Sequence, residues 1–84
     1  MKKILLDMME KLINDKYDCN EFSFDFPNEM FGEDDRKALM ILDDMPEICA
    51  SYDEHKEDEE DLLNDQELIE KVKEVYEELK KAGY

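Results

Sequence analysis

Acidic residues dominate one short stretch of this chain, and carboxylates at such a density can bind a cation or a basic partner. The stretch is 51–66, SYDEHKEDEEDLLNDQ, and it contains eight acidic residues against the single base Lys56. It also holds His55, the only histidine of the chain. Like charges placed so closely repel one another and destabilise a compact fold, whereas a cationic partner would relieve the repulsion. The stretch is therefore the first candidate for a functional surface.

Three kinds of site that use acidic residues, serine or histidine do not fit this sequence. A calcium-binding EF-hand loop needs alternating oxygen ligands, a glycine at its sharp turn and a closing glutamate. The acidic stretch has no glycine and places His55 and Lys56 near its start. A carrier protein needs a serine at the start of a helix, and neither Ser23 nor Ser51 has that context. The single histidine, His55, lies within a run of charged residues and forms no catalytic pattern with a serine or cysteine, so we expect no enzymatic activity. We also expect no metal and no cofactor.

The net charge excludes some classes of partner. The 84 residues include 26 acidic and 11 basic ones, for a net charge of −15. Nucleic acids and anionic membranes are themselves negative and would be repelled, so we expect neither as a partner. The acidity belongs to the middle of the chain, because 18–70 contains 20 acidic and 3 basic residues, a net of −17. This distribution fits a basic protein partner, a cation or plain solubility.

The cysteines and the apolar segments indicate the compartment. Cys19 and Cys49 stand in no CxxC spacing, so they are most simply reduced, partly buried thiols. The opening MKKILLDMMEKL has its apolar run broken by Asp7 and Glu10, which argues against a signal peptide. No stretch approaches the ~20 apolar residues of a membrane span. We therefore expect a cytoplasmic protein.

The first and last helices have the clearest patterns. Residues 2–15 place apolar side chains three and four positions apart: Ile4, Leu5, Met8 and Leu12, with Met9 and Ile13 beside them. Near the other end, Asn64 and Glu67 form a capping-box pattern, which marks the start of a helix. The apolar face of this last helix is made of Leu68, Ile69, Val72, Val75, Tyr76 and Leu79. Lys80 and Lys81 suit its negative C-terminal end.

A second helical segment is expected between Asn20, as its N-cap, and Gly32, as its stop. Its apolar face consists of Phe22, Phe26 and Met30. The phenylalanines at 22, 24 and 26 also alternate as in a strand, but a lone strand has no partner in this chain. Phe24 cannot share the helical face, so it is either a surface anchor or a cover for the edge of the core.

A third helical segment, 36–52, follows Asp34 or Asp35 as its N-cap. Its apolar stripe consists of Leu39, Leu42, Met45, Cys49 and Tyr52. Pro27 and Pro46 interrupt the second and third segments, and the sequence leaves open whether each proline kinks a helix or starts a new one.

Four helical segments with apolar stripes predict an all-α fold. We expect a small antiparallel four-helix bundle that forms a single domain over residues 1–84, with its middle helices kinked at Pro27 and Pro46 as one alternative. A chain of this length has no room for a second core.

The layout resembles that of the bacterial self-protective colicin-like immunity proteins, of the type that neutralises colicin D, and of immunity proteins from contact-dependent inhibition systems. The likeness covers most of the chain and lies in KKILLDMMEKLIND, CNEFSFDF, LDDMPEICASYDEH and DQELIEKVKEVYEEL. Members of this family are small antiparallel helical bundles. They bind a cognate toxin, commonly a ribonuclease that cuts tRNA with a basic cleft, and occlude its active site.

The resemblance implies an acidic surface that imitates phosphates and forms salt bridges to lysines and arginines of a basic toxin domain. The residues that would form it are Asp43, Asp44, Glu47, Asp53, Glu54, Glu57, Asp58, Glu59, Glu60 and Asp61, with Tyr52 as a packing anchor at the edge. A function of a different class stays open, namely an acidic helical adaptor or regulatory protein that binds a basic peptide or protein.

Overall fold

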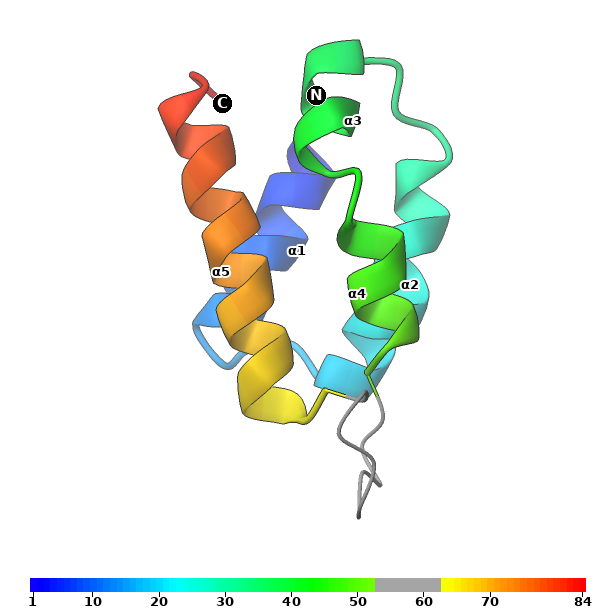
Figure 1. Ribbon diagram of the computed structural model, residues 1–84, viewed down its shortest axis with the longest axis vertical. Coiled ribbons are helices and arrows are strands. Elements are labelled where there is room, and N and C mark those ends of the chain that lie inside the picture. The colour runs from blue at the N-terminus through cyan, green and yellow to red at the C-terminus, as the bar shows by residue number, and fades with distance from the viewer. Residues whose placement is uncertain (53–62) are drawn as a thin grey trace.

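Five α-helices account for most of the residues that the computed structural model describes, which are 1–52 and 63–84 (Figure 1). Their bounds are α1 Lys3–Ile13, α2 Cys19–Met30, α3 Arg36–Ile41, α4 Met45–Ala50 and α5 Asp65–Lys81. Within the two described ranges, the only pairing of extended backbone is an isolated bridge between Tyr52 and Leu63. The prediction of an all-α fold is therefore confirmed.

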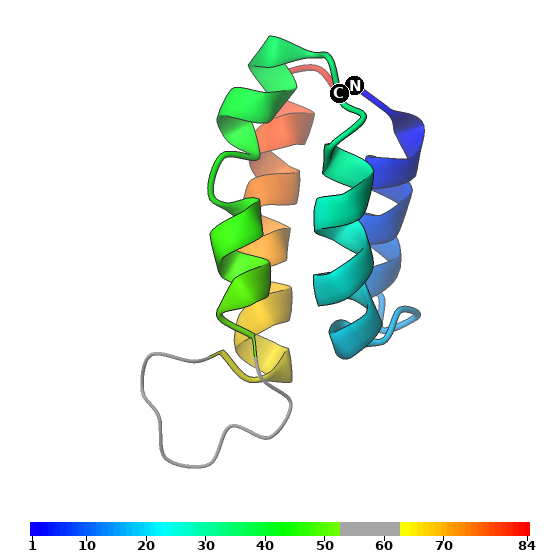
Figure 2. The ribbon, with the colours of Figure 1, turned by 90° about the vertical axis from the view of Figure 1, so that its right-hand side faces the viewer.

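The chain reverses its direction from helix to helix, except that α3 and α4 follow one another in the same direction. In Figure 1 it descends along α1, returns along α2, descends through α3 and α4, and returns along α5. Helix α1 packs against α2 and α5, α2 also packs against α4, and α5 contacts α3 and α4. Both chain ends lie at the end of the molecule where α2 connects to α3 (Figure 2). The helices thus surround a common core.

The two prolines have different positions relative to their helices, and only Pro46 stands at the start of one. Pro27 lies inside α2, which continues to Met30. Pro46 lies in the first turn of α4, where a residue without a backbone N–H is tolerated because that N–H would have no helical partner. Helix α3 has already ended at Ile41. The predicted third helix is therefore two short helices, and Pro46 belongs to the start of the second.

Polar caps define where three of the helices begin. The predicted capping box is confirmed, since Asn64 accepts from the Glu67 N–H at 2.8 Å and Glu67 accepts from the Asn64 N–H at 3.3 Å. Asp35, one of the two expected caps of α3, accepts from the Ala38 N–H at 3.2 Å. The prediction of Asn20 as a cap was wrong, because the carboxylate that caps α2 belongs to Asp18.

The start of α2 at Cys19 follows from packing. With Asp18 as its cap, the helix places Cys19, Phe22 and Phe26 three and four residues apart on one face, and all three are buried. The Phe22 and Phe26 rings stack with their centroids 4.9 Å apart. Phe24 lies off this face and is 76% exposed. Of the two expectations for Phe24, exposure at the surface is the one that the structure supports.

The core draws on all five helices. Its buried members are Leu5, Met8, Met9, Leu12, Cys19, Phe22, Phe26, Ala38, Leu42, Met45, Cys49, Leu68, Val72, Val75 and Leu79. Several residues expected on the apolar stripes are less buried than predicted, among them Ile4 and Leu39. Ile4 is 45% exposed, because it lies to one side of the stripe that runs from Leu5 to Leu12. In α3 the buried position belongs to Ala38, and Leu39 is only partly buried.

Candidate functional site

The structure describes four of the eleven residues that were predicted to bind a partner. Asp43 and Asp44 lie in the turn between α3 and α4, Glu47 lies in the first turn of α4, and all three are exposed. Tyr52 follows the end of α4 and is partly buried against the core. The remaining seven lie outside the described residues: Asp53, Glu54, Glu57, Asp58, Glu59, Glu60 and Asp61.

Two of the predicted acids, Asp44 and Glu47, line a groove between α4 and α5 with a volume of about 460 Å³. The apolar residues of the groove are Ile41, Ile48, Leu63 and Val75. Because Val75 belongs to the core and Ile41 and Ile48 pack against it, the groove has an aliphatic floor. Ser51 lines the groove at the end of α4, and its carbonyl accepts from the Leu63 N–H at 2.8 Å.

Helix α5 contributes two acids to this groove that were not predicted as site residues, Glu74 and Glu78. Together with Lys71 and Val75 they occupy positions three and four residues apart, which places all four on one face of the helix. That spacing is visible in the sequence. It does not reveal that the face turns toward α4, since this depends on how helices distant in the chain pack together.

The groove carboxylates have no partners among the described residues. The side chains of Asp44, Glu47, Glu74 and Glu78 form no hydrogen bond or ion pair there, and Lys71 pairs with none of them. Asp44 is the N-cap residue of α4 but makes no capping hydrogen bond. Its backbone is in the helical region (φ −85°, ψ −10°), whereas a capping side chain needs an extended backbone. The groove therefore presents four unpaired carboxylates and one lysine.

Asp43 does not join the other two acids in this groove. It lines a separate hollow on α3 of about 520 Å³, together with Arg36, Leu39 and Met40. Met40 is 79% exposed. The predicted pair Asp43–Asp44 therefore divides between two surfaces, because consecutive residues in a helical turn point in directions about 100° apart.

Tyr52 connects the end of α4 to the start of α5. Its hydroxyl donates to the carboxylate of Asp65, the first residue of α5. Its backbone also forms the isolated bridge with Leu63. These contacts join the end of α4 to Leu63 and to the first turn of α5.

The two cysteines are free and buried, and they do not form a nucleophilic site. Burial raises the pKa of the Cys49 thiol to about 12. Burial, reinforced by the nearby Asp65 carboxylate, raises the pKa of the Cys19 thiol to about 11. Since the thiolate is the reactive form, both side chains are unreactive at neutral pH.

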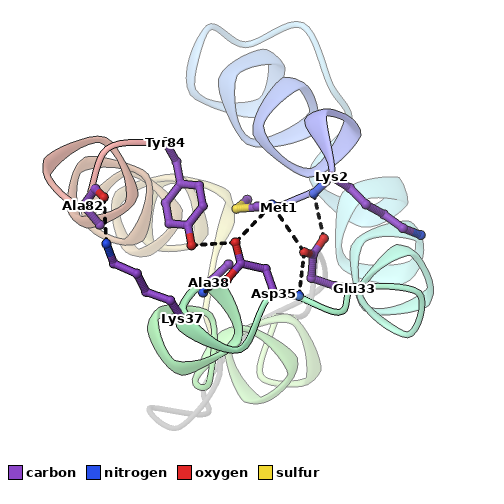
Figure 3. A network of polar contacts seen from close by, with 8 residues as sticks. All are labelled: Met1, Lys2, Glu33, Asp35, Lys37, Ala38, Ala82 and Tyr84. Carbon is purple, nitrogen blue, oxygen red and sulfur yellow. Dashed lines mark hydrogen bonds and ion pairs between the residues drawn. The ribbon is translucent and has the colours of Figure 1, made fainter.

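A second polar cluster, which we call the terminal clasp, joins the chain ends to the α2–α3 connection (Figure 3). Among the described residues, Glu33 is the one charged residue that is buried. Its carboxylate accepts hydrogen bonds from the Lys2 N–H at 2.7 Å and from the Asp35 N–H at 3.2 Å. Asp35 accepts from the Met1 amino group at 3.1 Å and from the Tyr84 hydroxyl at 2.7 Å.

The hydrogen bonds of the terminal clasp hold the Asp35 carboxylate in its ionised form. The Tyr84 hydroxyl, the Ala38 N–H and the Met1 amino group together lower the pKa of Asp35 to about 2. The same contact to Asp35 raises the pKa of Tyr84 to about 12. The carboxylates of Glu33 and Asp35 already accept hydrogen bonds from other groups of the chain. The terminal clasp therefore serves the fold rather than a ligand.

Comparisons of the chain with protein-family models, with curated proteins and with solved structures found no match. None of the helices within residues 1–52 and 63–84 combines the length and the apolar character that crossing a membrane requires.

Proposed function

We propose that this chain is an immunity-type inhibitor that binds a basic toxin domain of the ribonuclease class and covers the active site of that domain. The observation that carries the proposal is the groove between α4 and α5, with four unpaired carboxylates around an aliphatic floor. A basic cleft that binds phosphates would attract such a surface. The resemblance to colicin-like immunity proteins supports the same function.

The sequence adds further acidic residues next to two residues of this groove along the chain. Ser51 and Leu63, which line the groove, flank the segment 53–62, and that segment carries seven acidic residues and one lysine. Charge of one sign near a binding surface raises the rate of encounter with an oppositely charged partner, up to ~10⁸–10⁹ M⁻¹s⁻¹ at low salt. Fast association suits an inhibitor that must bind its toxin before the toxin acts.

The fold and compartment form part of the same proposal. In it, α3 and α4 together take the place of the third helix of an antiparallel four-helix bundle. The inhibitor works in the cytoplasm, where an RNA substrate of the toxin would be, and it neither binds nucleic acid nor performs a reaction itself.

Co-expression tests the proposal directly. The reading frame upstream of the gene for this chain is expressed in a bacterial host with and without the chain. We expect growth arrest without it and growth with it. An upstream product that is harmless by itself would overturn the proposal.

Charge reversal then tests the role of the acidic segment. Changing Glu57, Asp58, Glu59 and Glu60 to lysine should weaken toxin binding by orders of magnitude and leave helicity, measured by circular dichroism, unchanged. The matched control reverses four exposed acids that do not line the groove: Asp7, Glu10, Glu70 and Glu77. If both variants lose affinity equally, net charge alone determines binding.

A second function is supported by the shape of the same surface. An adaptor that binds a basic peptide would use a groove rather than a ridge, and the carboxylates of α4 and α5 do line a groove. In that case the upstream product would be harmless, while the chain would still bind basic peptides.

A further inference from the structure

The groove between α4 and α5 has two chemically different parts. Its floor contains the aliphatic side chains of Ile41, Ile48 and Val75. Its polar side chains include Asp44 and Glu47 on the α4 side and Glu74 and Glu78 on the α5 side. A surface that only imitated phosphates would need carboxylates and no aliphatic floor. The combination therefore indicates that the partner presents apolar groups as well as positive charge.

Metal ions fit this arrangement poorly. Among residues 1–52 and 63–84, no three aspartate, glutamate, cysteine or histidine side chains come close enough together to hold one ion. The four carboxylates are instead distributed over two helices along the groove. Such a distribution suits an elongated cation with an apolar body.

Lysine and arginine side chains have this structure, because they lay an aliphatic stem on apolar surface and keep the charged head among polar groups. Arginine also donates two parallel hydrogen bonds to a carboxylate. Four unpaired carboxylates against the single positive charge of Lys71 leave the groove with a net charge that favours such a side chain.

We propose that the groove receives a segment of the partner protein in which an arginine or lysine is flanked by aliphatic side chains. The inference rests on the proposed function, since it names what the toxin domain presents to the inhibitor. The aliphatic neighbours contact Ile41, Ile48 and Val75, and the cationic head lies among the carboxylates of α4 and α5. A desolvated contact of this kind slows dissociation, whereas exposed charges chiefly speed association.

The first test uses two short capped peptides of equal charge, one alternating leucine with arginine and the other alternating glycine with arginine. We expect the leucine peptide to bind more tightly, as measured by fluorescence anisotropy at physiological salt. In NMR spectra its addition should shift the methyl signals of Ile41, Ile48 and Val75. Equal affinity for both peptides, or unshifted methyl signals, would overturn the inference.

The second test compares two double variants on α5 that remove the same charge. Changing Glu74 and Glu78 to glutamine should weaken binding of the leucine peptide about tenfold, which corresponds to about 1.4 kcal/mol. Changing Glu70 and Glu77, which are exposed and do not line the groove, should weaken it much less. An equal loss of affinity in the two variants would show that peptide binding depends only on the overall charge of the chain. Circular dichroism and thermal unfolding confirm that both variants are folded.

Repeating the comparison with the toxin domain separates this inference from the proposed function. If the Glu74 and Glu78 variant binds the toxin as tightly as the control variant, the toxin does not use the groove and the inference fails, although the inhibitor function stands. If no upstream toxin exists but the leucine peptide binds in the groove, the inhibitor function fails and the adaptor function takes its place.

Discussion

The carboxylates of this chain differ in what they contact, and this difference separates structural residues from candidate binding residues. Glu33 and Asp35 accept hydrogen bonds from groups at both ends of the chain. Asp44 and Glu47, by contrast, have no partner among the described residues although they line a groove. In a chain with 26 acidic residues, the presence of an acid says little about its role. The contacts of each acid are therefore the better guide.

Replacing Asp35 by asparagine should change how stability depends on pH. The pKa of Asp35 is lowered to about 2 in the folded chain, so this group stabilises the fold above its unfolded pKa of about 4. That stabilisation is lost as the pH falls from about 4 toward 2. We expect the difference in unfolding free energy between wild type and Asp35→Asn to shrink over this window, as measured by urea unfolding at several pH values.

Two further variants test whether this pH dependence comes from the contacts of Asp35. Tyr84→Phe removes the shortest hydrogen bond to Asp35 and should reduce the same pH dependence in part. Asp34→Asn changes an exposed neighbour of Asp35 and should leave the pH dependence of stability close to that of wild type. A constant gap between wild type and Asp35→Asn from pH 2 to pH 6 would contradict the role assigned to the terminal clasp.

At the scale of the helices, the starts of α4 and α5 show how backbone geometry decides the use of a polar side chain. Asn64 has an extended backbone and caps α5, whereas Asp44 precedes α4 with a helical backbone and does not cap it. The turn from α3 leads directly into α4, so Asp44 continues the helical conformation. Its carboxylate remains available to the groove.

Removing these two side chains should therefore have unequal effects on stability. Asn64→Ala loses a capping hydrogen bond, and we expect it to lower the unfolding free energy by about 1 kcal/mol. For a chain of this size, that change lowers the melting temperature by about 4–8 °C. Asp44→Ala should stay within about 0.5 kcal/mol of wild type, as an exposed substitution without a structural contact.

Thermal unfolding followed by circular dichroism measures both variants, with Asp18→Ala as a positive control because Asp18 caps α2. If Asp44→Ala proves as destabilising as Asn64→Ala, Asp44 serves the fold and not the groove.

At the scale of the whole molecule, ion pairs among the described residues compensate little of the negative charge. Within residues 1–52 and 63–84, the Met1 amino group forms ion pairs with Glu33 and Asp35, while no lysine or arginine side chain lies within 4.0 Å of a carboxylate oxygen. Self-repulsion of a chain with a net charge of −15 therefore opposes folding. A basic partner would remove part of this cost on binding.

Salt should consequently raise the stability of the free chain. The distance over which charges interact falls from about 30 Å at 0.01 M salt to about 10 Å at 0.1 M, so added salt weakens the repulsion. We expect the melting temperature to rise over this range, equally with sodium chloride and choline chloride. A rise with sodium alone would point to ion binding, and a fall in either salt would contradict the repulsion. Binding of a basic toxin should weaken over the same range.

Local patterns in the sequence were sufficient for much of the fold. The apolar spacing of α1 and α5 and the capping box of Asn64 and Glu67 all act within a few residues, so no tertiary information was needed to predict them. The cap of α2 and the buried position in α3 were not predicted correctly. In both cases several residues had suitable chemistry, and packing against other helices selected Asp18 and Ala38.

By itself, the sequence determined that the chain is helical, that its middle is acidic and that Phe24 stands apart from the core face, because composition and helical period act locally. Only the tertiary structure decided that Asp44 and Glu47 share a groove with Glu74 and Glu78, that Asp43 lies in another hollow, and that Asp35 contacts Tyr84. These pairs are far apart in the chain or differ by one step around a helix. Their proximity therefore depends on how whole helices pack against one another.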